Sequence, residues 1–301
     1  MSQLSPSDSV PKYLPHMQHK DVISMAMASL NKRNWIEPDP HYSCYLEHKL
    51  ALRKQNKQPI FDALPSAYAA QCELAAQLRA HLLADHSHLY CPLGNGLCYL
   101  PDGIELAEST KHPLWNASLW VADDLLIMQK VDGEYCLTAA SLCSPSNWHL
   151  AEKIGQPMAK IHDPVPTIHQ KLTPKIDRFF DHLTAENPIQ RFNWSLQGDC
   201  NLAQFPEDKV IYAPNTPLYY RCERQTLTRL PQTNAIAFTI RVYIYPMMAL
   251  AQVPHALTQL KAAIDAMPTA VKGYKDIIYF APALQKYFSD LSSIKAQVQN
   301  R

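Results

Sequence analysis

The strongest chemical pattern in the sequence is a predicted hairpin at residues 219–245, whose four arginines include Arg224 and Arg241. Residues 235–245 alternate in polarity, which is typical of a strand with two different faces. One face is apolar and consists of Ile236, Phe238, Ile240, Val242 and Ile244. The other grades from small to large and polar, through Ala235, Ala237, Thr239, Arg241, Tyr243 and Tyr245. Small side chains on a strand leave room for a flat molecule to lie against the sheet.

Two of the four arginines of this hairpin are predicted to face each other. A turn at residues 231–234 puts Arg224 opposite Arg241, with Thr226 on the same face. Like charges directly opposite are destabilising, unless an anion such as a pair of carboxylates lies between them. The alternative is that both guanidinium groups reach water at the end of the strand. The pattern therefore favours, as a hypothesis, a site for a flat, anionic ligand.

His162 is the candidate metal ligand, in the stretch KIGQPMAKIHDPVP (153–166). It ends a short predicted helical turn, and Pro164 and Pro166 restrict the backbone that follows it. A metal ligand needs a neutral imidazole nitrogen held in one direction. The carboxyl end of a helix also favours a nearby cation. The alternative is a histidine that caps the free carbonyls of the turn.

A second group of histidines, HLLADHSH at 81–88, could also bind a metal, but a solvated helix end explains it better. The eight cysteines contain no CxxC pair and are predicted to be reduced thiols, which argues against a cysteine-held zinc or iron–sulfur site.

Composition excludes several classes of protein. The net charge of +1 gives no electrostatic case for nucleic acid or an anionic membrane. Only seven glycines occur in 301 residues, with no GxGxxG or P-loop motif, so a classical dinucleotide-binding fold or P-loop is not expected. The first residues, MSQLSPSDSVPK, do not read as a signal peptide, and we expect a cytoplasmic location.

The order of predicted elements indicates an α+β fold. Strands are expected at 119–130, 135–144, 192–196 and 201–205, before the hairpin, with an Asp-Gly turn at 132–133. Helices are expected at 45–56, 66–83, 147–154, 158–162, 173–183, 255–266 and 282–298. An antiparallel sheet with helices inserted between its strands is the order of a PAS-like domain. We divide the chain into an N-terminal arm and helical extension (1–110), a PAS-like ligand-binding core (111–250) and C-terminal helices that pack on the core (251–301).

Three segments together resemble one known family. They are WIEPDPHY (35–42), SLCSPSNWHLAEKIGQPMAKIHDPVP (141–166) and YRCERQTLTRLPQTNAIAFTIRVYIYP (220–246), and the resemblance is to the haem-dependent oxidative N-demethylase alpha-subunit family. The resemblance implies a haem b enzyme on a PAS-like domain. It further implies dioxygen, a reductase partner that supplies electrons from NADPH through flavin and an iron–sulfur centre, and demethylation of a small secondary amine such as dimethylamine with release of formaldehyde.

The hairpin, the histidine and the implied haem suggest one site. His162 is expected to be the ligand of the iron. Haem propionates are expected to meet the arginines, and the cofactor-binding set is then Arg224, Arg241, Thr226, Thr239 and Ala237. A dialkylammonium substrate needs a carboxylate or an aromatic wall, for which the catalytic candidates are Glu223 and Tyr243. The predicted register turns Glu223 away from the arginines, so a structural pair with a basic residue explains it equally well.

Two other functions remain open. The first is a PAS-like haem or small-ligand sensor that binds without turnover, and the second is a structural subunit that has lost its cofactor. No output domain is recognisable in the sequence, which favours an enzyme subunit over a sensor.

Overall fold

A seven-stranded sheet forms the centre of the molecule in the computed structural model, which describes residues 10–18, 26–107, 109–163 and 173–299. The strand order is β1-β8-β9-β10-β6-β7-β2, and all neighbours are antiparallel. The strands are β1 (Ala28–Ser29), β2 (Phe61–Ala63), β6 (Asp124–Val131), β7 (Glu134–Ser141), β8 (Ile189–Gln197), β9 (Tyr219–Arg229) and β10 (Ile236–Pro246). A smaller sheet contains β3 (Tyr90–Leu93), β4 (Gly96–Tyr99) and β5 (Ile104–Leu106).

The register predicted for the hairpin is confirmed. Arg224 pairs with Arg241, and Thr226 pairs with Thr239. The turn after β9 is held by Glu73, whose two carboxylate oxygens accept hydrogen bonds of 2.8 Å from the backbone N–H groups of residues 232 and 233. Both arginines thus take the sheet position predicted from the alternation of residues 235–245, and a distant carboxylate stabilises the turn between the strands.

The strand predicted from residue 119 begins only at Asp124. The buried ammonium group of Lys49 donates hydrogen bonds to the carbonyls of Ser118, Val121 and Asp123, at 2.7, 3.1 and 2.6 Å. These carbonyls are bonded to a lysine and not to a neighbouring strand, so the ladder starts after them.

The strand predicted at 201–205 is absent. Asp199 accepts a hydrogen bond from the backbone N–H of Asn201, at 2.8 Å, and turns the chain. Within this stretch the structure gives only an isolated bridge between Gln204 and Ser146.

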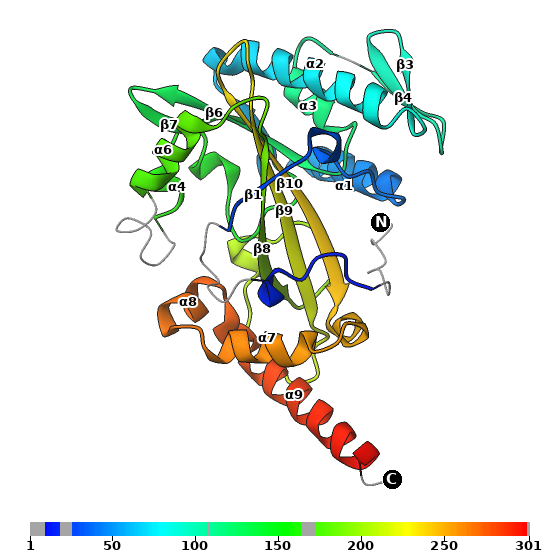
Figure 1. Ribbon diagram of the computed structural model, residues 1–301, viewed down its shortest axis with the longest axis vertical. Coiled ribbons are helices and arrows are strands. Elements are labelled where there is room, and N and C mark those ends of the chain that lie inside the picture. Colours follow the sequence, from blue (N-terminus) through cyan, green and yellow to red (C-terminus); the bar gives the residue numbers. More distant parts are fainter. Residues whose placement is uncertain (1–9, 19–25, 108, 164–172, 300–301) are drawn as a thin grey trace.

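Helices lie on both sides and at one end of the large sheet (Figure 1). They are α1 (Tyr42–Gln55), α2 (Tyr68–Asp85), α3 (Pro113–Ser118), α4 (Met158–Ile161), α6 (Thr173–His182), α7 (Ala256–Asp265), α8 (Thr269–Tyr274) and α9 (Ile277–Gln299). The predicted helix at 147–154 is only a 3₁₀ turn at Leu150–Glu152, while α9 begins before Pro282. Among the described helices, none is both long and apolar enough to cross a membrane.

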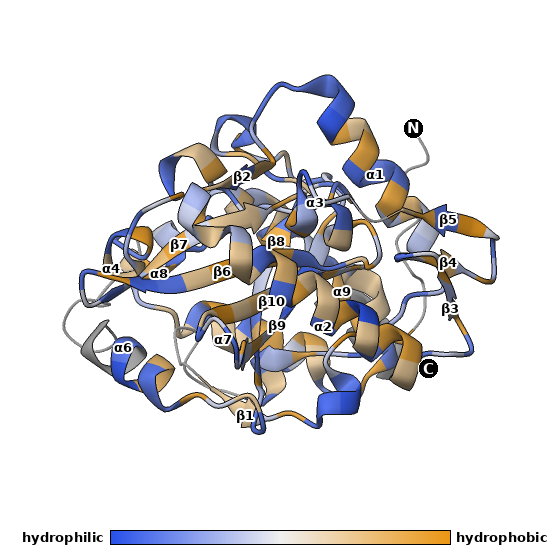
Figure 2. Ribbon diagram, turned by 90° about the horizontal axis from the view of Figure 1, so that it is seen from above, coloured by the Kyte–Doolittle hydropathy of each residue, from blue (hydrophilic) through white to orange (hydrophobic). Residues whose placement is uncertain are grey.

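Both faces of β9 and β10 are covered, although hydrophobic and hydrophilic residues lie side by side along these strands (Figure 2). We call the face that carries Ala237, Thr239 and Arg241 the arginine face; it packs against α1, α2 and the segment that precedes them. We call the face that carries Ile236, Phe238 and Ile240 the aliphatic face; residues of α4 and α6 join its core. The expected combination of helices with an antiparallel sheet is confirmed. The domain division remains a prediction, and both edge strands come from the first 110 residues.

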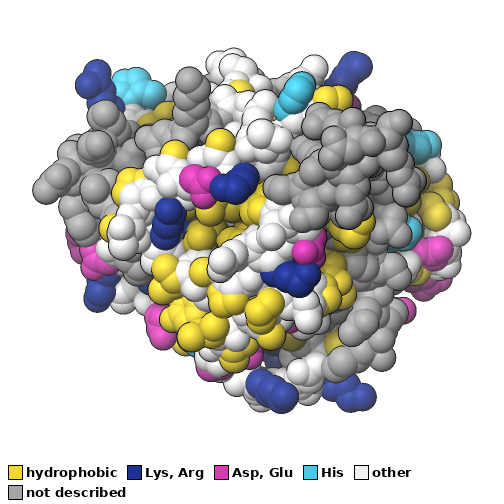
Figure 3. All heavy atoms as spheres, turned by 90° about the horizontal axis from the view of Figure 1, so that it is seen from below, with side chains coloured by type: hydrophobic (Ala, Val, Ile, Leu, Met, Phe, Trp, Pro, Cys, Tyr) yellow, Lys and Arg dark blue, Asp and Glu magenta, His cyan; other side chains and the backbone are white. Residues whose placement is uncertain are grey.

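The end of the molecule formed by α7 and α9 has a mixed surface. Figure 3 shows hydrophobic side chains there among basic and acidic ones. Large apolar residues of the described chain that stay exposed include Val210, Ile211, Met248 and Ile278.

Candidate functional site

The arginine face is filled by the segment around residues 34–39, which corrects the expectation of an open floor for a flat ligand. Arg224 Nη1 donates to the carbonyl of Trp35 at 3.1 Å, and its Nε lies 3.4 Å from a carboxylate oxygen of Glu37. Arg241 forms an ion pair with Asp39. The pair of carboxylates that the facing arginines require is therefore supplied by the protein itself, from the motif WIEPDPHY.

The small side chains of this face belong to the hydrophobic core. Ala237 is fully buried in a cluster that also contains Trp35 and Ile36. Thr226 and Thr239, also fully buried, hydrogen-bond to each other across the strands at 2.7 Å. The space above them is occupied by the protein, so the described structure offers no slot for a macrocycle there.

Tyr243 is committed to Glu37. Its hydroxyl donates to Glu37 at 2.5 Å, Lys12 donates to the same oxygen at 2.8 Å, and Tyr13 donates to the other oxygen. Burial alone would raise the pKa of Glu37, but the hydrogen bonds from Lys12, Tyr13 and Tyr243 outweigh it and lower the pKa. The carboxylate therefore stays ionised beside Arg224.

Asp123 is a third carboxyl group on this side of the sheet. It is fully buried, and neither of its oxygens has a hydrogen-bond partner among the described residues. Burial raises its pKa, although the charges of Arg241, Arg224 and Lys49 oppose the shift. Asp123 makes no hydrogen bond to either arginine, so Glu37 and Asp39 are the carboxylates that pair with Arg224 and Arg241.

His162 lies on the opposite side of the sheet, next to the aliphatic face. It follows α4, whose Met158 and Ile161 pack into the core of that face. Successive residues of a strand point to opposite faces, so the side chains of Arg224 and Arg241 point away from it. The expectation that His162 and both arginines hold one ligand is therefore wrong in geometry. Pro164 and Pro166, predicted to brace the histidine, lie outside the described residues.

The imidazole of His162 is held in one tautomer. Nδ1 lies 2.9 Å from the carbonyl of Met158, which can only accept, so Nδ1 carries the hydrogen and Nε2 carries the lone pair. Burial lowers the pKa of His162, and the charges of Arg191 and Lys153 lower it further. A neutral ring with one nitrogen fixed by a backbone carbonyl is the form that binds metals.

Arg191 is the functional candidate that sequence reasoning missed. It lies on β8 opposite Gln225, on the same face as Glu223. Its Nε is buried without a hydrogen-bond partner among the described residues, and so is Oε1 of Gln225. The strand was predicted to begin at residue 192 but begins at Ile189. A strand predicted from residue 189 would have included Arg191.

Glu223 lies on the aliphatic face, as its predicted register required, and it is paired. Its carboxylate accepts from Arg221 Nε at 3.2 Å, Gln225 Nε2 at 3.1 Å and Asn193 Nδ2 at 3.3 Å. Glu223 therefore forms the structural pair with a basic residue, Arg221, that was one of the two predictions for it. A substrate contact from the same carboxylate remains a prediction.

Lys275 completes this polar group from the helical end of the molecule. Its buried ammonium donates to Asn193 Oδ1 at 2.6 Å and to the carbonyl of Trp194 at 2.7 Å. Burial lowers its pKa to about 8, although Glu223 opposes the shift. The aliphatic face thus carries a neutral histidine, the cationic side chains of Arg191, Arg221 and Lys275, and the carboxylate of Glu223.

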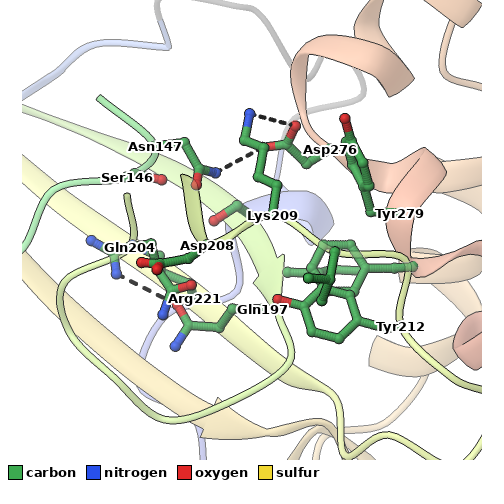
Figure 4. Close-up of a pocket in the computed structure, with 14 residues that line it drawn as sticks. Ser146, Asn147, Gln197, Gln204, Asp208, Lys209, Tyr212, Arg221, Asp276 and Tyr279 are labelled. Atoms are coloured by element: carbon green, nitrogen blue, oxygen red, sulfur yellow. Dashed lines mark hydrogen bonds and ion pairs between the residues drawn. The ribbon is translucent and has the colours of Figure 1, made fainter. Parts of the chain in front are cut away.

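A polar cleft opens beside this group (Figure 4). Its volume is about 410 Å³, and it is partly open to solvent. Lys209 and Asp276 form an ion pair of 2.9 Å at its wall, and Asn147 donates to Asp276 at 2.7 Å. The guanidinium of Arg221 bonds to the carbonyls of Leu202 and Ser144. The charged groups named here already have partners, so we assign no ligand to this cleft.

Replacing Gly198 by Ala is expected to destabilise the wall of this cleft. A Cβ at residue 198 would overlap the ring of Tyr212, which stacks on Phe280 with a centroid distance of 4.6 Å. Overpacking of this kind costs about 1–3 kcal/mol of unfolding free energy. Urea denaturation measures the loss, and Gly273→Ala is the control, because a Cβ there meets nothing within 4 Å. Equal midpoints for both variants would contradict the packing.

No group of three or more histidine, cysteine or acidic side chains within the described ranges could hold a metal ion. The histidines of segment 81–88 illustrate this, since His81 is bonded to Asp85 at 3.0 Å and accepts from the backbone of Ile36. A metal held through one protein side chain, as haem iron can be, requires no such group.

Taken together, the fold and the site define an α+β protein with one fixed, neutral histidine beside an apolar sheet face. Comparison with known families identifies the relatives. The family described as "Haem-dependent oxidative N-demethylase, alpha subunit-like" matches residues 26–285. The chain belongs to this family, which confirms the resemblance seen in its sequence motifs. The description names a haem-dependent oxidative enzyme and likens its members to the alpha subunit of that enzyme.

Proposed function

We propose that this chain binds haem b on the aliphatic face, with Nε2 of His162 as the ligand of the iron. The observation that carries the proposal is the hydrogen bond from Nδ1 of His162 to Met158, because it presents the lone pair of a neutral ring in one direction. Haem-ligating histidines need this arrangement, and family membership supports the cofactor.

The residues around His162 suit the rest of a haem. Phe238 and Ile244 are half-buried apolar side chains of the same face, fit for contact with a macrocycle. The unpaired Nε of Arg191 would meet a propionate, and Gln225 lies opposite it on the neighbouring strand. In this proposal Arg191 takes the part expected of Arg224 and Arg241. Those two arginines, with Thr226, Thr239, Ala237 and Tyr243, have a structural role.

The proposed reaction is oxidative N-demethylation of a small secondary amine such as dimethylamine, with dioxygen as oxidant and formaldehyde as product. Bound haem would supply the redox chemistry, with electrons from a reductase subunit that carries flavin and an iron–sulfur centre and uses NADPH. The chain would orient the cofactor and exclude water. Glu223, as a carboxylate within a polar group beside Arg191, is our candidate for holding the ammonium of the substrate.

This proposal treats residues 111–250 as a PAS-like ligand-binding core. A cytoplasmic location remains a prediction from the first residues of the sequence, and the absence of nucleic acid or membrane partners remains a prediction from the net charge.

Formaldehyde release tests the proposed reaction. Protein produced with a haem precursor is mixed with NADPH, a reductase and a panel of methylated amines, and we expect formaldehyde from at least one secondary amine. Glu223→Gln should raise the KM for that amine by roughly tenfold, because a charge-assisted bond to an ammonium is worth about 1.5–3 kcal/mol. Its haem content should stay unchanged.

The control is Glu186→Gln, since Glu186 is an exposed side chain outside the proposed site. Binding of oxygen or carbon monoxide without turnover of any amine would favour a sensor. Protein without pigment after the same expression would favour a subunit that has lost its cofactor.

A further inference from the structure

Two cysteines face each other in the small sheet. Cys91 on β3 is the direct antiparallel partner of Cys98 on β4, and both are partly exposed. Residues directly opposite in an antiparallel pair have Cα atoms about 4.5–5.5 Å apart. A disulfide needs about 4.4–6.8 Å, so the spacing of facing residues is compatible with this bond.

The two thiols already interact in the reduced protein. The pKa of Cys98 is raised by burial, by the thiol of Cys91, to which it is hydrogen-bonded, and by the charge of Glu105. Glu105 is the partner of Cys98 on β5, so the three side chains form a row across the small sheet. A raised pKa makes Cys98 a slow nucleophile, which assigns the first attack to Cys91.

The remaining cysteines lack this arrangement. Cys136, Cys143 and Cys222 are buried. The partly exposed ones lie on separate parts of the chain: Cys44 on α1, Cys72 on α2 and Cys200 after β8.

We propose that Cys91 and Cys98 are a redox-active dithiol that forms a reversible disulfide by exchange with a low-molecular-weight disulfide. The thiolate of Cys91 attacks one sulfur of that disulfide and releases a first small thiol. The thiolate of Cys98 then attacks the mixed disulfide at Cys91 and releases a second one. Two protein thiols are oxidised, one small disulfide is reduced, and the two thiol protons end on the released molecules.

The bond would join the two strands of a hairpin whose turn is held by α2. Arg79 of α2 donates to the carbonyls of Gly94 and Gly96, at 3.1 and 3.2 Å, which holds the turn of the hairpin. A covalent link between β3 and β4, close to these contacts, limits local opening of the hairpin. We expect amide hydrogen exchange at residues 90–99 to slow by roughly tenfold on oxidation.

The test uses the full-length protein, treated anaerobically with oxidised glutathione over a range of ratios and then with dithiothreitol. We expect the titratable thiols of the denatured protein to fall from eight to six, and peptide mapping to find Cys91 joined to Cys98. Dithiothreitol should restore both thiols. Phenylarsine oxide, which binds paired thiols, should bind the reduced protein at one equivalent and should not bind Cys91→Ser or Cys98→Ser.

Cys44→Ser is the matched control, a partly exposed cysteine without a facing thiol, and it should keep both responses. Glutathione attached stably to Cys91 or Cys98, without a bond between them, would overturn the proposal. The proposal would also be overturned if other cysteines formed a disulfide before Cys91 and Cys98 did. Because the mapping is done on the unmodified chain, failure of a variant to fold does not affect this outcome.

Discussion

His162→Ala is expected to remove haem from the protein, with a loss of at least about tenfold in pigment per chain and no normal Soret band. The substitution deletes the nitrogen whose lone pair the Met158 hydrogen bond makes available. Changes to residues that merely support a metal ligand cost about 10–100-fold in affinity, and the ligand itself should cost no less. Absorption spectra and haem content of protein expressed with a haem precursor give the measurement.

His182→Ala is the matched control for this variant. Nδ1 of His182 contacts the carbonyl of Arg178 at 2.6 Å, the same contact four residues back at the end of a helix, but the side chain is exposed. Its loss should leave the spectrum unchanged. Imidazole added to His162→Ala should restore part of the Soret band if the cavity left behind still faces the iron. A normal spectrum and haem content in His162→Ala would remove this residue from the site.

The parts of the site that could be predicted from sequence depend on local interactions. The alternation of residues 235–245 and the turn at 231–234 determine the register, so the sequence alone is enough to place Arg224 opposite Arg241. His162 could be placed at the end of a helical turn for the same reason.

What covers each face of the sheet could not be predicted. A period of two shows that two faces differ, but not which distant segment lies on which face. The carbonyl of Trp35 that meets Arg224 is 189 residues away in the chain. Two facing arginines require a carboxylate pair, but the sequence does not say that Glu37 and Asp39 supply it. The small residues Ala237 and Thr239 suggest space for a ligand, and a tryptophan and an isoleucine from a distant part of the chain fill it.

Asp39→Asn is expected to lower the free energy of unfolding by about 3 kcal/mol without loss of haem. Arg241 is fully buried and pairs with Asp39, whose side chain is only 15% exposed. Removal of one partner leaves a buried charge that lacks compensation, which costs about 3–5 kcal/mol. Burial opposes the charge of Arg241, yet the net shift of its pKa is upward, because Tyr45 and Asp39 stabilise it. The guanidinium of Arg241 therefore keeps its proton, so loss of Asp39 leaves a buried positive charge. Urea denaturation at neutral pH gives the loss of stability.

The double variant Asp39→Asn with Arg241→Met separates a structural pair from a ligand site. If the pair is structural, the two losses are not additive, and the double variant should be more stable than the sum of the single variants predicts. Asp290→Asn, which breaks the exposed pair with Lys286, should cost no more than about 0.5 kcal/mol and serves as control. A variant of Arg241 that lost haem while its urea midpoint stayed unchanged would return the cofactor to the arginine face. Because His162 and Arg241 lie on opposite faces of one sheet, only one of the two substitutions can act directly on the pigment.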